Sequence, residues 1–494
     1  MRLNPPVIVE VTRESLAAAV ADQLDAGLRL ALVAGHQDDA GFRLVYLFLG
    51  SAGARVELVL RLTADDAWMP TLAGLSYPAG RFEREQRDLF GIVPKDHPQP
   101  YRLVRHAHWP TGYHPMLRDA GRPSGFDADA GFPFVEVSGK GVYEIPVGPV
   151  HAGMIEPGHF RFSVVGETIV RMYQRLWFVH RGVEKLFEGR LVTDGLALAE
   201  RISGDTTVGH SLGYLMAVED ALGIEVGLRA RLIRALLLEC ERLYNHVNDL
   251  GAIVNDTGFG VLNAQAQVLR EKLLRHNQRL TGHRLLRGGV SLGGATVQEL
   301  PDLALIAEVA DGVAELAAIA TGHSLVANRL DTTAVLGLDN AVRLGVLGYV
   351  ARASGISVDA RIDQPFVELG SEFAPVLGET GDVRARFDVR AGEAAVSARL
   401  IAELTGWISS EAAVGEAVEA APDASGAGVG VVEAWRGTLV HRVEVADGRL
   451  TRVKVVDPSF FNWPGLGVAL ADVIVPDFPL ANKSFNCSYA GNDL

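Results

Sequence analysis

The stretch RGVEKLFEGRLVTDGLALAERISGDTTVGH, residues 181–210, ends in a short polar run. This run places Ser203 and Thr206 three residues apart, with Asp205 between them and His210 four residues further on. We expect the run to lie on one helix from Asp194 to Leu222. Its hydroxyl, carboxylate and imidazole groups suit proton transfer, whereas they are poor ligands for soft metals.

The frame of this stretch resembles the first signature of NiFe hydrogenase large subunits, an R-G-x-E followed by R-x-C-G-x-C-x-x-x-H. Here the two cysteine positions are Ser203 and Thr206. The second cysteine pair of that family stands near the C-terminus, and its positions are Ser488 and Gly491, with Cys487 one residue out of frame. Nickel–iron centres need soft thiolate ligands. The resemblance therefore implies a hydrogenase-like scaffold in which this chain binds neither nickel nor another cofactor.

Further motifs extend the resemblance over almost the whole chain. Residues 82–98 fit the E-R-E-x-x-D-L-F-G-I-x-x-x-x-H-P signature of the C subunit of bacterial NADH:quinone oxidoreductase. Residues 348–366 and 433–460 resemble runs shared by energy-converting hydrogenases and the D subunit of that oxidoreductase, although Tyr349 and Phe366 depart from them. A C-like unit fused to a D-like unit is the layout of formate hydrogenlyase and hydrogenase-four-type large subunits.

Composition and charge narrow the class of protein. The 494 residues are 48% hydrophobic and carry a formal net charge of -14, which fits a globular protein and argues against nucleic acid as a partner. Two cysteines cannot form a disulfide framework, and no signal-peptide pattern opens the sequence. The most apolar run, residues 303–326, contains three acidic residues, so no transmembrane segment is expected. With the resemblance, this predicts a peripheral subunit on the cytoplasmic side of a membrane.

The order of predicted elements indicates an α+β protein. Residues 1–118 should form a small α+β domain like the C subunit, with an exposed, charged helix over 83–88. A polar, glycine-rich linker is predicted at 119–133. Residues 134–494 should form a D-subunit-like domain with a long-helix bundle and a small C-terminal β-sheet.

Helical spacing of apolar residues begins at about residue 166, where Ile169, Met172, Tyr173 and Leu176 recur at short intervals. This spacing predicts helix there, ahead of the long helices of the bundle.

Four ionisable residues form the candidate site: Glu156, His159, Asp205 and His210. Glu156 matches the hydrogenase glutamate that relays protons beside the metal, so the resemblance implies a proton relay or a small-substrate pocket. An ordinary loop salt bridge between Glu156 and His159 is an equal alternative. His180 and Glu184, four residues apart, predict an ion pair on a helix.

A quinone site is possible but lacks its usual residues. The D-subunit loop G-P-x-H-P-x-T-H-G supplies a quinone-contacting histidine, and residues 148–151 fit its start, including His151. The second histidine falls near Pro157, and the family tyrosine falls at Gly204.

The resemblance implies a subunit of a membrane-associated, complex-I-like oxidoreductase related to energy-converting hydrogenases. It would couple electron transfer from an adjacent small iron–sulfur subunit, which holds a 4Fe–4S cluster, to proton or ion translocation through membrane subunits. Two alternatives stay open. One is a non-catalytic structural or regulatory docking subunit of such a complex, and the other is an active hydrogenase or quinone reductase with unusual ligands.

The resemblance also makes a spatial prediction. The two pairs of former cysteine positions should converge, although they stand far apart in the sequence. We expect a polar pocket there, with Glu156 on its wall, Asp205 beside it and His210 turned inward.

Overall fold

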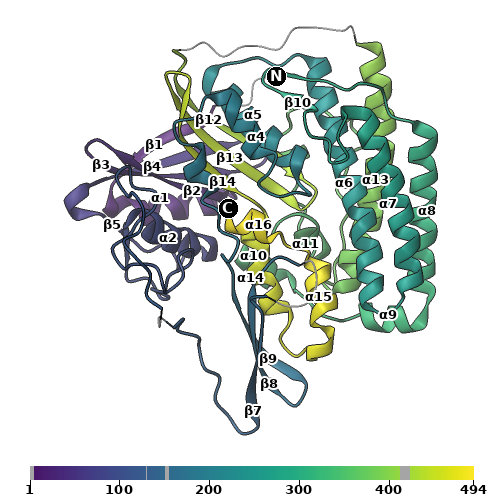
Figure 1. Cartoon of the computed structure of the whole chain (residues 1–494), viewed down its shortest axis with the longest axis horizontal. Coiled ribbons are helices and arrows are strands. Elements are labelled where there is room, and N and C mark those ends of the chain that lie inside the picture. The colour runs from purple at the N-terminus through teal and green to yellow at the C-terminus, as the bar shows by residue number, and fades with distance from the viewer. Residues whose placement is uncertain (1–4, 129–130, 151–154, 412–422) are drawn as a thin grey trace.

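The computed structural model describes residues 5–128, 131–150, 155–411 and 423–494. Its N-terminal unit, purple in Figure 1, is a four-stranded sheet of strand order β1-β4-β3-β2 with helix α1 against it. Thr12 caps α1 by accepting a hydrogen bond from the Ser15 amide. The elements of this unit are β1 Val7–Val11, α1 Arg13–Asp25, β2 Arg29–Asp38, β3 Gly41–Leu49, β4 Arg55–Thr63, η1 Ala64–Asp66, β5 Trp68–Pro70, α2 Tyr77–Phe90 and β6 Val93–Lys95.

Helix α2 is buried, which corrects the expectation of an exposed helix over 83–88. Its carboxylates have partners inside the protein. Glu85 forms an ion pair with Lys454 of the C-terminal sheet at 2.7 Å, and Asp88 accepts a hydrogen bond from the Leu103 amide at 2.8 Å. A run of charges usually indicates a solvated face, but paired charges can be buried.

A three-stranded sheet, β7 Val142–Val147, β8 His159–Val165 and β9 Thr168–Arg175, projects from the body of the molecule (Figure 1). The helix predicted from about residue 166 is therefore wrong. Ile169 and Met172 are buried three residues apart, as on one face of a helix. This spacing arises because a β-bulge at Ser163 and Val164 shifts the register between β8 and β9.

Four long helices, α6, α7, α8 and α13, stand side by side, away from the N-terminal unit (Figure 1). The long-helix bundle predicted from the sequence is thus confirmed. The elements of this part are α3 Val183–Phe187, α4 Val192–Ala199, α5 Thr207–Leu222, α6 Leu228–Asp256, α7 Gly260–Thr281, β10 Val290–Ser291, β11 Gly294–Ala295, α8 Leu303–Gly322, α9 Ser324–Leu330, α10 Leu338–Leu344, α11 Gly348–Ala353, α12 Ala360–Asp363 and α13 Val383–Ser410. Within the residues described, no helix is both long and apolar enough to span a bilayer.

The single helix predicted from Asp194 to Leu222 is instead two helices. Helix α4 ends at Ala199, and α5 begins at Thr207. The polar run forms the turn between them, because its side chains bond within the turn and compete with helical backbone bonds.

The C-terminal sheet has strand order β12-β13-β14 and carries α5 on one face. Gly430 of β12 allows this close packing, since a Cβ there would lie 2.0 Å from the carbonyl oxygen of Gly213 in α5. The elements of this part are β12 Gly426–Ala434, β13 Gly437–Ala446, β14 Arg449–Val456, α14 Ser459–Ala469, η2 Val475–Asp477, α15 Phe478–Phe485 and α16 Tyr489–Asp493.

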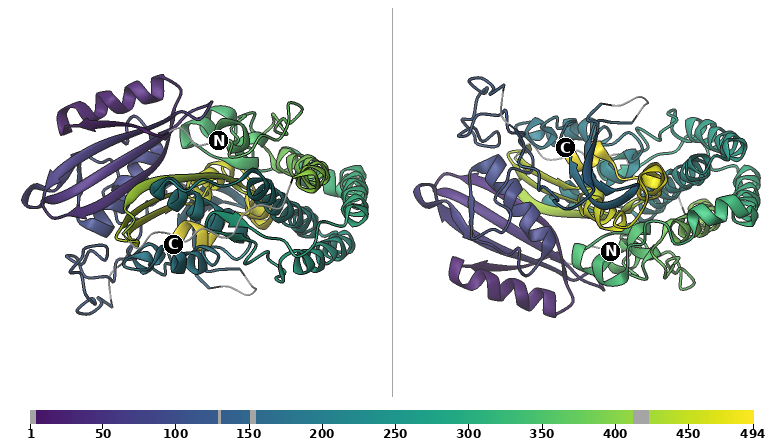
Figure 2. Two further views of the ribbon diagram at one scale, coloured as in Figure 1. Left: turned by 90° about the horizontal axis from the view of Figure 1, so that it is seen from above. Right: turned by 90° about the horizontal axis from the view of Figure 1, so that it is seen from below.

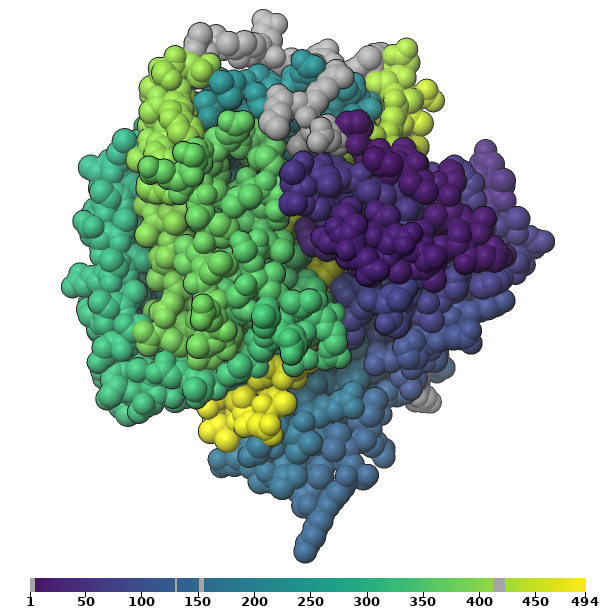
Figure 3. All heavy atoms as spheres, turned by 180° about the vertical axis from the view of Figure 1, so that it is seen from behind, coloured from purple at the N-terminus to yellow at the C-terminus, as the bar shows by residue number. Residues whose placement is uncertain are grey.

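The N-terminal unit packs against the C-terminal sheet, as Figure 2 shows from above and below, and Figure 3 shows it against the green segment that contains the short helices α10 and α12. Buried polar contacts join the units. Arg442 pairs with Glu57 at 2.8 Å, and Arg55 donates to Gln364 at 2.8 Å. The described part of the predicted linker, 119–128 and 131–133, contains neither helix nor strand.

Candidate functional site

The turn between α4 and α5 holds the first pair of hydroxyls. The side chains of Ser203 and Thr206 donate to Oδ1 of Asp205 at 2.9 and 3.0 Å. Both hydroxyl residues are buried, whereas the Asp205 side chain is 39% exposed. The carboxylate therefore connects a buried hydroxyl cluster to the surface.

The C-terminal tail supplies the second pair. Asn486 ends α15 in the left-handed backbone region. Ser488 then caps α16 by accepting a hydrogen bond from the Gly491 amide at 2.9 Å. The amide of Ser488 in turn donates to the hydroxyl of Ser459 in α14 at 2.9 Å. These bonds hold the Ser488 side chain inward.

The two pairs converge, as the sequence predicted. Oγ of Ser203 lies 2.8 Å from Oγ of Ser488, across 285 residues of chain. Arg436 lies beside them. It donates to both carboxylate oxygens of Asp205, at 2.7 and 2.6 Å, and to the carbonyl of Asn486 at 2.6 Å. In place of the expected open pocket, an ion pair and its hydrogen bonds close this cluster.

The ion pair fixes the charges in the cluster. Burial acts to raise the pKa of Asp205, but the Arg436 guanidinium outweighs it and lowers that pKa to about 2. Burial likewise acts to lower the pKa of Arg436, but the Asp205 carboxylate raises it above its ordinary value. Asp205 is therefore an anion at neutral pH and a weak proton acceptor.

Behind the hydroxyls, one carboxylate and two imidazoles form a buried row. Oδ2 of Asp457 lies 3.2 Å from Nε2 of His210, and Nδ1 of His210 lies 3.3 Å from Nε2 of His441. Burial acts to raise the pKa of Asp457, but its bond with His210 lowers that pKa below the ordinary value. Burial and His210 together hold the pKa of His441 well below its usual range. The anionic Asp457 favours a proton on the facing nitrogen of His210, and the two rings can exchange a proton.

Glu241 of α6 is a further buried acid at the start of α5. Its carboxylate oxygens accept from the amides of Val208 and Gly209 at 2.6 and 3.0 Å. Burial raises the pKa of Glu241 to about 8. The group is therefore mostly protonated at neutral pH.

The donor set does not fit a nickel centre. Ser203, Thr206 and Ser488 offer hydroxyls, which are hard, weak ligands. Burial raises the pKa of the Cys487 thiol, so it is not a thiolate at neutral pH. Gly491, at the fourth ligand position, has no room for a ligand side chain. A Cβ there would lie 2.7 Å from the Asp457 carboxylate.

Two of the four candidate residues, Asp205 and His210, lie in this cluster. Glu156 lies at its outer side, where its carboxylate accepts from the Ala490 amide at 3.0 Å, and the residue is exposed. It touches the tail and does not reach the buried row.

His159 lies apart from the cluster. It begins β8, its Nδ1 bonds with the Gly148 carbonyl at 3.2 Å, and it lines a separate cavity with Phe134. In the part of the chain that the structure describes, no ion pair joins His159 to Glu156. His151 lies outside the described residues.

The predicted helical pair of His180 and Glu184 is wrong. Helix α3 begins only at Val183, so His180 precedes it. His180 bonds with the Asp493 carbonyl at 2.6 Å, whereas Glu184 pairs with Arg452 at 2.8 Å.

Sequence reasoning did not assign a role to Arg436, Asp457, His441 or Glu241. Arg436 stands in the E-x-x-R-G part of a recognised motif, so that motif was an available signal. Nothing local marks the other three, since two lie on or just after strands and Glu241 lies on a buried helix. Their meeting depends on the packing of α5 against α6 and the C-terminal sheet.

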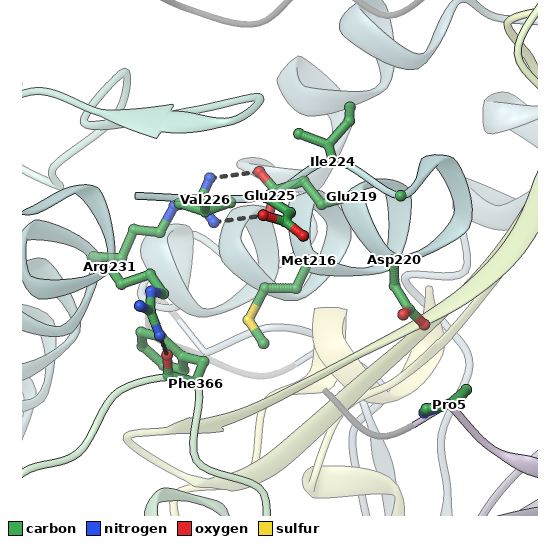
Figure 4. A pocket seen from close by; sticks show the side chains of 11 residues that line it. Pro5, Met216, Glu219, Asp220, Ile224, Glu225, Val226, Arg231 and Phe366 are labelled. Atoms are coloured by element: carbon green, nitrogen blue, oxygen red, sulfur yellow. Dashed lines mark hydrogen bonds and ion pairs between the residues drawn. The ribbon is translucent and has the colours of Figure 1, made fainter. Parts of the chain in front are cut away.

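A cavity of about 390 Å³ lies at the other end of α5 (Figure 4). Two charged residues of its lining, Arg234 and Glu219, are already paired with each other. Arg234 donates to both carboxylate oxygens of Glu219 at 2.8 and 2.6 Å. It shares no lining residue with the hydroxyl cluster.

Three protein-family models match successive parts of the chain. Residues 9–124 match the family "Respiratory-chain NADH dehydrogenase, 30 Kd subunit", residues 181–249 match "Nickel-dependent hydrogenase", and residues 256–424 match "Respiratory-chain NADH dehydrogenase, 49 Kd subunit". The predicted fusion of a C-like and a D-like unit is confirmed.

Individual proteins agree with the family matches. The chain is 32% identical to hydrogenase-4 component G of Escherichia coli, over 92% of this chain and 81% of that protein. It is 32% identical to formate hydrogenlyase subunit 5 of the same organism, over 83% and 74% of the two chains. Among solved structures, a chain of the membrane-bound sulfane sulfur reductase, an archaeal respiratory membrane complex, matches with a TM-score of 0.64 and 25% identity, over 72% of this chain and 99% of that chain.

Proposed function

We infer the role of this chain from its family, since it belongs with hydrogenase-4 component G and formate hydrogenlyase subunit 5 among the subunits of hydrogenase-like and complex I-like membrane complexes. We propose that it is the peripheral, nickel-free large subunit of such a complex, on the cytoplasmic side of the membrane. A neighbouring small subunit with a 4Fe–4S cluster would deliver electrons beside the hydroxyl cluster, and membrane subunits would carry the coupled protons or ions.

The observation that carries this proposal is the contact between Ser203 and Ser488. The positions that hold metal in nickel hydrogenases still meet at 2.8 Å, but they meet as hydroxyls next to the Asp205–Arg436 pair. The scaffold is retained while the metal chemistry is lost. Its remaining chemistry is that of hydrogen bonds and protons.

The buried row of Asp457, His210 and His441 indicates which residues would transfer the proton. Asp205 cannot hold a proton at neutral pH, because Arg436 keeps it ionised. Asp457, His210 and His441 are instead joined by contacts of 3.2 and 3.3 Å, which form a buried path along which a proton can pass. A cluster in the neighbouring subunit would supply the electron, and the negative charge that it adds would attract a proton along this row. The row is thus suited to pass a proton when an electron arrives.

The alternative function is a docking subunit without a proton-transfer role. The specific observation in its favour is the closed state of the cluster, because Arg436 and Asp205 satisfy each other without a ligand.

The two functions are distinguished by the redox behaviour of the intact complex, purified through a tag on this chain. If reduction is coupled to protonation, the midpoint potential of the neighbouring cluster should fall by up to about 59 mV per pH unit. Asp457→Asn and His210→Gln should flatten that slope while the complex still assembles. An unchanged slope in both variants would support the docking subunit. Elemental analysis should find far less than one nickel per chain, and stoichiometric nickel would contradict the proposal.

A further inference from the structure

A large groove opens beside the hydroxyl cluster, on the side of the N-terminal unit. Its volume is about 780 Å³. One wall is the arm of residues 104–121 that follows β6, and the other is the segment 177–186 that joins β9 to α3. Arg181 ties this second wall to the turn that carries Ser203, by donating to the carbonyls of Arg201 and Ile202 at 3.0 and 2.6 Å.

The lining of the groove is basic in an otherwise acidic protein. The chain carries a net charge of -14, but the described residues that line the groove include Arg105, Arg118, Arg181 and Lys185 and no aspartate or glutamate. Such a local excess of one charge attracts ligands of the opposite charge.

Two of these cations donate hydrogen bonds to backbone carbonyls. Arg105 donates to the Pro110 carbonyl at 2.8 Å, and Arg181 donates to the two carbonyls named above. Lys185 and Arg118 have acidic neighbours at the rim, Glu188 and Asp39. The lining of the groove therefore keeps an excess of positive charge, because its acidic neighbours are the buried Asp88 and the rim residues Glu188 and Asp39.

The groove is also preformed. The buried Asp88 accepts hydrogen bonds from the amides of Leu103 and Val104, both at 2.8 Å, and Arg175 donates to the Arg105 carbonyl at 3.1 Å. These bonds fix the arm against the body of the protein. A ligand would find the groove already shaped, which reduces the entropic cost of binding.

Aromatic and apolar side chains line the same groove. Trp109 stacks on Tyr113 with a centroid distance of 5.6 Å. Phe178 and Leu186 expose 37% and 47% of their surface there. Tryptophan, tyrosine, phenylalanine and arginine are the residues enriched at protein–protein interfaces and their hot spots.

We propose that this groove docks a carboxylate-rich segment, flanked by apolar residues, of a neighbouring protein subunit. The guanidinium N–H groups of Arg105 and Arg181 that bond to backbone carbonyls are occupied, so these two residues attract an anionic segment mainly through the electrostatic field of their charge. A concave, aromatic groove also suits a chain segment better than a flat lipid surface. The inference deepens the proposed function, on which it rests for the presence of neighbouring subunits. It places one of them directly beside the Ser203 turn.

The first experiment is site-specific photocrosslinking in the assembled complex. Leu186 is replaced by p-benzoylphenylalanine, and Val261 of α7, which is 71% exposed, carries the same group as the control. We expect Leu186 to crosslink to one protein subunit within a segment rich in aspartate or glutamate, and Val261 not to do so. Crosslinks only to lipid, to nucleotide or to a second copy of this chain would overturn the proposal, as would a segment without carboxylates.

The second experiment reverses charge. Arg118→Glu with Lys185→Glu should reduce co-purification of the crosslinked subunit at least tenfold, and lysines at the crosslinked carboxylates should restore it. The matched control is Arg275→Glu with Arg279→Glu on α7, where both side chains are exposed. Equal loss in the control pair, or no rescue, would contradict docking. Neither pair touches His210 or Asp457, so complex that still assembles should keep its potential–pH slope if the proposed function holds.

Discussion

The hydroxyl cluster and a buried ion network around Arg352 differ in the charged groups that they contain. In the network, Arg352 contacts Glu393, Glu433 and Asp359 at 2.6, 2.9 and 3.3 Å, and none of the four is more than 2% exposed. Each charge has an opposite partner. In the cluster, the four positions that resemble ligand positions carry three hydroxyl residues and a glycine, and the Asp205–Arg436 ion pair lies beside them.

This difference indicates which residues the fold requires and which positions only a metal centre would require. Thiolates can be exchanged for hydroxyls and glycine, because neutral groups that hydrogen-bond to each other carry little cost in the interior. The ion network cannot lose Arg352 in this way, because Glu433 would lose its cation, while Asp359 and Glu393 would keep Arg361 and His246. The fold therefore depends on the network more than on the ligand positions.

The largest expected effect is the loss of Arg352. Arg352→Met leaves three buried carboxylates without their shared cation and should destabilise the protein by about 3–5 kcal/mol. Denaturant unfolding measures the change. Arg275→Met on the exposed face of α7, where the side chain is 74% exposed, is the control and should change stability by less than about 0.5 kcal/mol. Similar values for both variants would mean that the network does not support the scaffold.

A smaller effect is expected at the fourth ligand position. Gly491→Ala places a methyl group 2.7 Å from the Asp457 carboxylate, which is held by His210 and by the Ser459 amide. The variant should lose about 1–3 kcal/mol, and less in an Asp457→Ala background, so that a double-mutant cycle shows coupling. Gly204→Ala, where a Cβ meets nothing within 4 Å, is the matched control. Additive effects of the two changes would show that Asp457 does not block this position.

A pH dependence of stability is expected at Glu241. The folded protein keeps this proton up to about pH 8, whereas an unfolded glutamate has an ordinary value of 4.5. The unfolded state binds fewer protons between these values, so this group's stabilising contribution falls as the pH rises through the window. Relative to Glu241→Gln, the wild type should therefore lose stability as the pH rises from about 5 to about 9. Thermal unfolding measures it, and a constant difference would rule out a buried, titrating Glu241.

The amino-acid sequence was enough to predict the α+β class, the N-terminal unit, the helix bundle and the meeting of Ser203 with Ser488. Motif spacing carries such information, because residues that enclose one site keep their places in the chain even when their chemistry changes. Local periodicity failed where tertiary contacts override it. The bulge in β8–β9 buries Ile169 and Met172 three residues apart, which is also the spacing of a helix. The polar turn after Ala199 ends α4, so that the one predicted helix is two.

Only the tertiary structure decided the charge state and contents of the site. Burial of α2 depends on Lys454, which lies far along the chain, and the cluster is closed by Arg436 from the end of β12. The row of Asp457, His210 and His441 exists because α5 packs on the C-terminal sheet. Sequence pattern reports which groups a chain contains, whereas hydrogen bonds and pKa values depend on distances of a few ångströms that folding alone sets.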